Sequence, residues 1–208
     1  MKKMTIMLVV AMMAMVTTAN AQLNLGVKGG LNMSNFYGDE LDGENMKIGF
    51  HVGLAADYDF TYNQAIQTGL YFTTKGAKYD GSIGDLAGDV TFNPMYLQLP
   101  VHYAYKIDIS PATRFVLHAG PYVAYGIGGK SKLSASTSDA SGEVDGPDLF
   151  GDNGALERFD AGLGLGVGFE FGQLLLDLGW DVGLVNISSS DNGDIKNQNA
   201  YLSVGYRF

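Results

Sequence analysis

The sequence predicts an all-β protein, an eight-stranded antiparallel up-and-down transmembrane β-barrel. Three observations carry this prediction. Apolar and small or polar residues alternate with a period of two in eight separate segments. Charged residues fall on only one face of those segments, and the connections between them are alternately short and long. This combination is typical of barrels in bacterial outer membranes.

The first 21 residues have the three-part plan of a secretory signal peptide. Two lysines open the segment, residues 4–16 are uncharged and mostly apolar, and residues 19–21 are Ala-Asn-Ala. A membrane anchor is the alternative, but 13 apolar residues are too few to cross about 30 Å of hydrocarbon as a helix. We expect cleavage after Ala21, which leaves residues 22–208 as one barrel domain.

Composition excludes several classes of protein. The chain has no cysteine, so it has neither a disulfide framework nor a lipid-modified cysteine after the leader. Its formal net charge is −9, or −11 without the two leader lysines, which argues against nucleic acid as a partner. The most apolar stretch after the leader, 163–180, contains Glu170, Asp177 and several glycines, so it would make a poor membrane helix.

Eight alternating segments supply the expected strands. Each is about 10 to 15 residues long, which is sufficient for a tilted strand to cross a bilayer. They are 23–34, 46–60, 64–75, 95–106, 114–127, 158–171, 174–184 and 198–208.

The two faces of these segments differ in charge. The apolar face carries no Asp, Glu, Lys or Arg, which is expected of a lipid-facing surface because a charge there costs about 2–4 kcal/mol. The opposite face carries many glycines, and we expect its charges to pair inside a narrow lumen because an unpaired buried charge is costly. Its charged residues and histidines are Lys28, Lys47, Asp57, Asp59, Lys75, Lys106, Arg114, Arg158, Asp160, Glu170, Asp177, Asp181, Arg207, His51, His102 and His118.

The connections give the expected orientation. Those at 61–63, 107–113 and 172–173 are short, whereas the others span about eleven to thirty residues, the longest being 128–157. Short turns are expected on the periplasmic side and long loops outside the cell. Aromatic residues gather at the short-turn ends, as an interfacial girdle would. Pro100 and Pro121 lie inside expected strands, so we expect bulges or locally broken pairing there, unless these strands are shorter.

Several segments resemble one family. The motifs are Gly-Leu-Tyr-Phe-Thr-Thr-Lys-Gly-Ala at 69–77, Tyr-Leu-Gln-Leu-Pro-Val at 96–101 and Ala-Gly-Pro-Tyr at 119–122, with 162–171 and 183–187. The chain is thus similar to the PorT-like outer-membrane β-barrel family, a porin family of Bacteroidota. The resemblance implies an outer-membrane barrel of unassigned function without catalytic residues. The alternating end of the chain, finishing on Phe208, also resembles the signal recognised by the barrel-assembly machinery during biogenesis.

Candidate binding chemistry is weak. Residues 124–131 match a relaxed phosphate loop, but no helix is expected to follow it. The three histidines lie on different expected strands, which favours hydrogen bonds within the lumen over a zinc site. The acidic connection 134–157 offers oxygen ligands for Ca²⁺, although a solvated loop is the favoured interpretation. Its candidate metal ligands are Asp139, Glu143, Asp145, Asp148 and Asp152. No cofactor and no catalytic residue is predicted.

Three functional hypotheses remain for this expected Gram-negative outer-membrane protein. The favoured one is a monomeric, non-catalytic envelope scaffold or surface-interaction protein, since the lumen of eight strands is filled by its own side chains. It would contact membrane lipid and lipopolysaccharide, and an extracellular partner through its loops. The alternatives are a narrow solute pore and a lipid-modifying enzyme. A soluble ligand-binding barrel is a fourth possibility, which the apolar outer face disfavours.

Overall fold

The computed structural model describes residues 22–38, 44–83, 86–136, 141–151, 154–190 and 193–208. The leader predicted for residues 1–21 therefore lies outside the described residues. Within the described ranges the chain forms ten antiparallel strands. These are β1 (Leu23–Gly38), β2 (Glu44–Thr61), β3 (Gln64–Thr74), β4 (Ala77–Ile83), β5 (Leu86–Ser110), β6 (Thr113–Ser136), β7 (Ser141–Asp148), β8 (Phe159–Phe171), β9 (Leu174–Gly183) and β10 (Ile195–Arg207).

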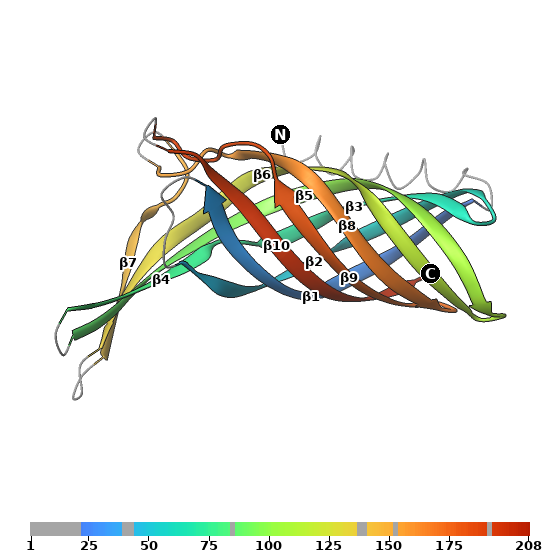
Figure 1. Cartoon of the computed structure of the whole chain (residues 1–208), viewed down its shortest axis with the longest axis horizontal. Helices are drawn as coiled ribbons and strands as arrows, with labels where there is room; N and C mark the ends of the chain where they lie inside the picture. Colours follow the sequence, from blue (N-terminus) through green and yellow to red (C-terminus); the bar gives the residue numbers. More distant parts are fainter. Residues whose placement is uncertain (1–21, 39–43, 84–85, 137–140, 152–153, 191–192) are drawn as a thin grey trace, which may run out of the picture.

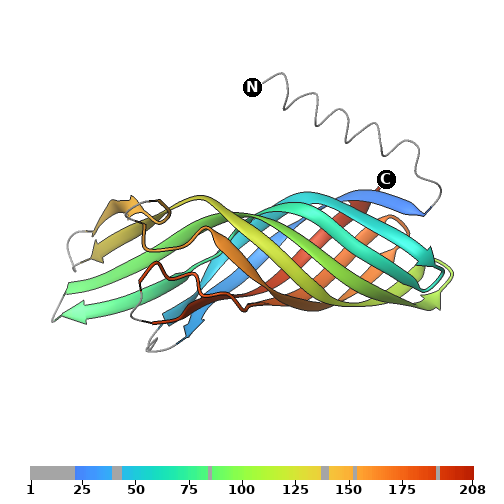
Figure 2. The same ribbon diagram turned by 90° about the horizontal axis from the view of Figure 1, so that it is seen from above.

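The strands close into a barrel (Figures 1 and 2). Starting at β1, neighbours around the ring are β2, then β3 with β4, then β5, β6, β8, β9 and β10, which pairs back with β1. Strands β3 and β4 occupy one position because both lie between β2 and β5. Strand β7 pairs with the part of β6 that extends beyond the first residue of β8, Phe159. The described chain thus has eight positions around the barrel, and the predicted fold class is confirmed.

A glycine separates β3 from β4. Gly76 has a φ of +125°, and a Cβ on it would lie 2.0 Å from the carbonyl oxygen of Phe92. Only glycine fits this close approach between neighbouring backbones. The interruption therefore changes the strand assignment without removing the segment from the barrel wall.

The barrel wall is apolar outside and polar inside. Strand β8 shows the pattern, because Leu163, Leu165, Val167 and Phe169 are exposed while the glycines that alternate with them are buried. Buried Lys106 and Asp160 point inward. This is the reverse of a soluble sandwich and suits an outer surface in contact with lipid. The described residues include no helix that is long and apolar enough to span a membrane.

The two prolines coincide with gaps in the strand pairing. Between β5 and β6 the register is interrupted from Pro100↔Tyr122 to Tyr103↔Ala119, and β3 and β5 are unpaired between Thr68↔Val101 and Tyr71↔Gln98. The register shifts in β5 lie elsewhere, at Met95/Tyr96 and Asp108/Ser110. Locally broken pairing was therefore the correct expectation at these positions, and bulges were not.

The barrel has two unlike ends. One, the short-turn end, carries the two-residue turns after β2, β5 and β8 and both ends of the barrel chain (Figure 1). At the other, the long-hairpin end, the hairpins β4–β5 and β6–β7 project beyond the rest of the wall (Figure 1). The prediction of long loops was wrong for much of 76–94 and 128–157. Their Ser-, Gly- and Asp-rich sequence hides the strand period, but backbone groups continue the ladder begun in the wall.

Candidate functional site

Polar and apolar side chains fill the lumen in three levels. At the short-turn end lies a charge network, which we define as Asp57, Asp59, Lys106, Arg114, Glu170 and Arg207. The middle level holds the histidines around a cavity. At the long-hairpin end lies an apolar cap, defined as Phe36, Ala77, Tyr96, Tyr122, Ala124, Leu149, Phe150, Leu156 and Ile187.

Glu170 is the centre of the charge network. Its carboxylate accepts hydrogen bonds from Arg207 at 2.6 and 3.2 Å and pairs with Arg114 at 2.6 Å and Lys106 at 3.2 Å. Arg207 also reaches Asp57 at 3.1 Å. These residues come from β2, β5, β6, β8 and β10, so the network ties together five positions of the ring.

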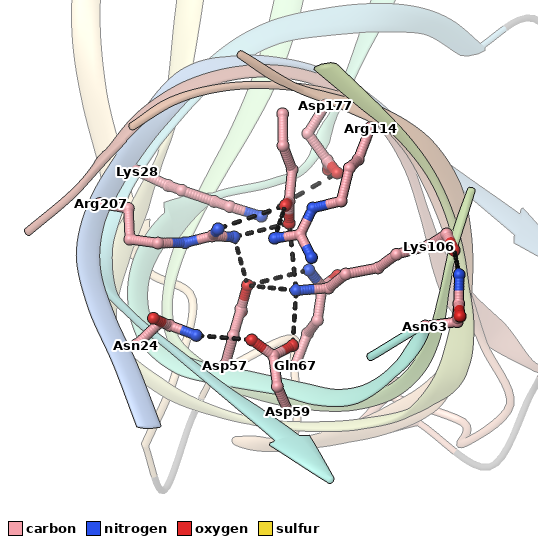
Figure 3. A network of polar contacts seen from close by, with 11 residues as sticks. Asn24, Lys28, Asp57, Asp59, Asn63, Gln67, Lys106, Arg114, Asp177 and Arg207 are labelled. Carbon is pink, nitrogen blue, oxygen red and sulfur yellow. Dashed lines mark hydrogen bonds and ion pairs between the residues drawn. The ribbon is translucent and has the colours of Figure 1, made fainter. Parts of the chain in front are cut away.

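Lys106 links the remaining acids. Its ammonium, fully buried, lies 2.7 Å from Asp59 and 3.8 Å from Asp57. Neutral amides extend the network, since Asn24 donates to Asp59 at 2.6 Å and Gln67 donates to Asp57 at 3.2 Å. Figure 3 shows these side chains converging inside the ring of strands. Three acids balance three bases, which offsets the cost of removing each charge from water.

Histidines dominate the middle level. His118 Nε2 lies 3.0 Å from Asp177 Oδ2, and His118 Nδ1 lies 3.0 Å from His102 Nδ1, with the two imidazole rings stacked. Lys28 lies 3.9 Å from the same Asp177 oxygen. Glycines opposite these rings make room for them, because a Cβ on Gly166 would lie 2.5 Å from the His118 ring.

A cavity of about 70 Å³ occupies this level. We call it the central cavity. His51 stands in its wall between Asn32, at 2.7 Å, and Ser203, at 2.8 Å. A second cavity of about 10 Å³ shares Lys28, Gln67 and Asp177 with the first and reaches Glu170. The polar space in the middle therefore continues toward the charge network.

A buried ion pair lies between the central cavity and the long-hairpin end. Lys75 Nζ is 3.1 Å from Asp160 Oδ2, and neither side chain has any exposed surface. The ammonium also lies 4.4 Å from the centre of the Tyr122 ring, a cation–π contact, and Asn197 donates to Asp160 at 2.9 Å. Each member of the pair therefore has a further favourable contact besides the ion pair itself.

The apolar cap covers this pair. Leu149 and Phe150 follow β7, where the chain returns from the hairpin tip to the barrel rim (Figure 1). Backbone hydrogen bonds fix the segment, from Leu149 to Gly129 at 3.0 Å and from Leu156 to Leu149 at 2.9 Å. The Phe150 ring meets Tyr96 edge-on at 5.6 Å between centroids. The long-hairpin end is therefore closed by packed hydrocarbon.

The structure brings most of the predicted inward residues together, but two of the basic residues depart from the predicted lumen network. Lys47 donates to the backbone oxygen of Lys75 at 3.1 Å. Arg158 donates to the oxygen of Gly126 at 2.8 Å and lies over the Phe150 ring. For both, the structure gives backbone acceptors and no ion pair among the described residues, so neither is joined to the predicted lumen network.

The acidic candidates for Ca²⁺ do not form a described site. Asp139 and Asp152 lie outside the described residues, as does the side chain of Glu143. Asp145 pairs with Lys130 at 3.7 Å, and Asp148 is exposed at the end of β7. Among the described residues there is no group of three or more His, Asp or Glu side chains arranged to hold a metal ion. The Ca²⁺ site stays a prediction.

The sequence reasoning missed the apolar cap. Leu149, Phe150, Leu156 and Ile187 all lie in connections, where no strand period reveals the inward direction. One signal was present, since two adjacent large apolar residues at 149–150 interrupt an otherwise polar and acidic stretch. Such residues favour burial, and the barrel mouth is the nearest place for it.

The comparison with known protein families agrees with this architecture. A family model described as "Outer membrane protein beta-barrel domain" matches residues 18–189. A comparison with curated proteins finds no significant match. Among solved structures, Ail, the attachment invasion locus protein of Yersinia pestis, is 17% identical, with 90% of this chain and 99% of that chain covered and a TM-score of 0.44.

Two further solved structures are similar at the same level. Neisserial surface protein A is 14% identical over 88% of this chain and 97% of its own, with a TM-score of 0.43. OprG from Pseudomonas aeruginosa is 13% identical over 89% and 95%, with a TM-score of 0.39. Because these values are low, the family assignment rests on the family model, and the fold on the closed strand topology.

Proposed function

Because the chain belongs to the outer membrane protein β-barrel domain family, we propose that it acts as a non-conducting outer-membrane barrel that presents its long hairpins to a partner outside the cell. The observation that carries this proposal is the double closure of the lumen. The charge network occupies the short-turn end and the apolar cap occupies the long-hairpin end. The central cavity between them has a volume of only about 70 Å³.

A solute crossing this lumen would have to displace both layers. At the short-turn end it would separate Glu170 from two arginines and a lysine. At the other end it would displace Phe150 and the buried Lys75–Asp160 pair. Separating buried, paired charges leaves each of them uncompensated, which is costly. This favours a plugged barrel over the narrow pore.

The projecting hairpins supply an interaction surface. Strands β4, β5, β6 and β7 are neighbours there, and one row across them pairs Tyr79 with Val90, Val90 with Leu133 and Leu133 with Val144. Directly paired residues point to the same face of a sheet. Leu133 and Val144 at the β7 side are 51% and 65% exposed. Tyr79 at the other side packs against the apolar cap, so the exposed end of the row, Leu133 and Val144, is the surface that we propose a partner covers.

The narrower parts of the proposal rest on the sequence motifs. We propose export by the leader with cleavage after Ala21, assembly by the barrel-assembly machinery, and membership of the PorT-like branch in a Gram-negative envelope. The functional barrel is a monomer in contact with outer-membrane lipid and lipopolysaccharide. It is not an enzyme, consistent with the structural role of its motifs.

Electrical recording of the folded barrel, residues 22–208, in a planar lipid bilayer tests the proposal. A closed lumen predicts no channel steps at moderate voltage, although the barrel has inserted. Insertion is verified independently by protection of the barrel from protease in the same lipid. Stable single-channel steps that change in size when Lys106 or Arg114 is replaced would establish a pore through the charge network and overturn the proposal.

A further inference from the structure

Asp181 differs from the other buried lumen acids. It is 2% exposed, and its Oδ2 accepts a hydrogen bond from Gln98 Nε2 at 2.8 Å. Within the described residues no lysine or arginine forms an ion pair with it. The buried acids that do have a basic ion-pair partner are Asp57, Asp160, Glu170 and Asp177. Asp181 therefore has no ion-pair partner of its own, and Lys75, whose charge also acts on it, is already paired with Asp160.

The hydrogen bonds of His118 imply that one ring nitrogen of the neighbouring His102 is an acceptor. An ionised carboxylate only accepts, so His118 Nε2 must donate to Asp177. In a neutral imidazole the other nitrogen, His118 Nδ1, then carries the lone pair and accepts from His102 Nδ1. The remaining nitrogen, His102 Nε2, is left as a lone pair. This buried atom has no hydrogen-bond partner in the described structure.

Two amide oxygens are also buried acceptors without a partner. Gln98 Oε1 and Asn199 Oδ1 are buried without a hydrogen-bond partner, and both residues line the central cavity together with His102 and Asp181. All four side chains are at least nine-tenths buried. Buried polar atoms are normally paired, so three unpaired acceptors beside one cavity indicate a missing donor or cation.

The residues that carry these acceptors are neighbours around the central cavity. Asn199 lies directly opposite Asp181 in the pairing of β10 with β9. Asp181 Oδ1 and His102 Nε2 lie 2.6 and 2.7 Å from the point that a Cβ on Gly164 would occupy. The absence of a side chain at Gly164 is what allows these two atoms to share this space.

We propose that the central cavity binds one monovalent cation beside Asp181, with Gln98, Asn199 and His102 as its other ligands. A single positive charge neutralises the single uncompensated carboxylate, which a divalent ion would overcompensate. An ammonium ion would donate directly to the four lone pairs, and an alkali ion would bind them directly or through its water. Lys28 also lines the cavity, but its ammonium is 3.9 Å from Asp177.

The cavity has room for this occupant. A water-sized group needs about 10–15 Å³ of such volume, so about 70 Å³ accommodates an ion with a few waters. The adjoining cavity of about 10 Å³ extends the polar space toward the short-turn end. The inference does not depend on whether the barrel conducts, because a site can exchange slowly through a plugged lumen.

Thermal unfolding of the folded barrel in detergent micelles tests this site. Ammonium, sodium or potassium chloride is exchanged for choline chloride at constant ionic strength, because choline is too large for the cavity. We expect the unfolding midpoint to rise with at least one small ion and to saturate, as for any ligand of the folded state. Which ion acts distinguishes ammonium from alkali-metal binding.

Two variants make the test specific. Asp181→Asn removes the uncompensated charge, so its midpoint should not depend on the cation. Asp59→Asn, the same change at a residue of the charge network that does not line the central cavity, should keep the response of the unmodified barrel. A midpoint that is the same in all salts, or an equal response in Asp181→Asn, would show that the cavity holds only water and overturn the proposal.

A third variant covers the case in which Asp181→Asn does not fold. Asn199→Ala removes one neutral acceptor and should raise the half-saturating cation concentration at least about tenfold. An unchanged half-saturating concentration would contradict the assigned ligands. Because the readout is binding and not current, its failure is distinguishable from a failure of the proposed non-conducting function.

Discussion

The two ends of the lumen are closed by different physical means. At the short-turn end, six charged side chains from five strands form one neutral network whose outer members, Asp59 and Arg114, retain 23% and 25% exposed side-chain surface. At the long-hairpin end, hydrocarbon packs over one ion pair, Lys75–Asp160, that has no exposed surface. At the short-turn end the charge is therefore shared among several partners and partly exposed to solvent. At the long-hairpin end it is confined to one fully buried pair.

This difference determines how well each end of the lumen tolerates the loss of a charged side chain. In the charge network a lost cation leaves other cations in contact with the same acids, since Glu170 alone has three basic partners. Asp160 has a single basic partner, Lys75, among the described residues. Loss of one member should therefore be more damaging at the long-hairpin end.

The largest effect is expected from Lys75→Met. It leaves Asp160 buried without its counter-charge, which should lower the free energy of unfolding by about 3–5 kcal/mol. Denaturant unfolding in lipid or micelles measures this. The double variant Lys75→Met/Asp160→Leu is the control and should recover most of the loss, whereas equal destabilisation of the single and double variants would contradict the uncompensated-charge account.

Phe150→Ala should have the next largest effect. It removes a large, 6% exposed side chain from the apolar cap, at a cost of about 3 kcal/mol in the free energy of unfolding. Because the charge network still closes the other end, the variant should remain silent in a planar bilayer. Conductance in this single variant would mean that the charge network is no barrier by itself.

Lys106→Met should cost less, about 2 kcal/mol, because Arg114 and Arg207 remain bonded to Glu170. Added salt should also reduce the difference between this variant and the parent, since part of the network is exposed and therefore screened. Unfolding curves at low and high salt check both points. A loss as large as that of Lys75→Met would show that the charge network tolerates a lost charge no better than the single buried pair does.

The smallest effect is expected on the projecting sheet. Lys130 and Asp145 are 3.7 Å apart, and both side chains are more than half exposed. Lys130→Ala should change the free energy of unfolding by less than about 0.5 kcal/mol. The same unfolding measurement applies, and a change above 1 kcal/mol would show that the projecting hairpins contribute to barrel stability.

The barrel wall could be predicted because lipid imposes a strict pattern on it. Period two and the absence of charge on one face identified the strand positions and the inward direction of residues such as Asp57, Glu170 and Arg207. The contacts among those residues could not be predicted. They depend on the register and stagger of the closed ring, which brings Arg207 of β10 beside Asp57 of β2.

The long-hairpin end was predicted poorly because the lipid constraint does not apply there. Beyond the lipid, strands need no apolar face, so 128–136 and 141–148 gave no clear period although they pair as strands. Leu149 and Phe150 enter the lumen from a connection, where local sequence carries no information about direction. Tyr96 and Tyr122, in contrast, have inward parity and could have been identified as lumen fillers.

Thiol labelling tests most directly the claim that the lumen is closed at both ends. The described chain has no cysteine, so Ser203→Cys places a single thiol in the wall of the central cavity, where Ser203 is 2% exposed. With a charged thiol reagent, the account predicts labelling of the folded barrel at least about a hundredfold slower than at the exposed control Ser189→Cys. Comparable labelling rates at the two positions would show an open aqueous path and contradict the account.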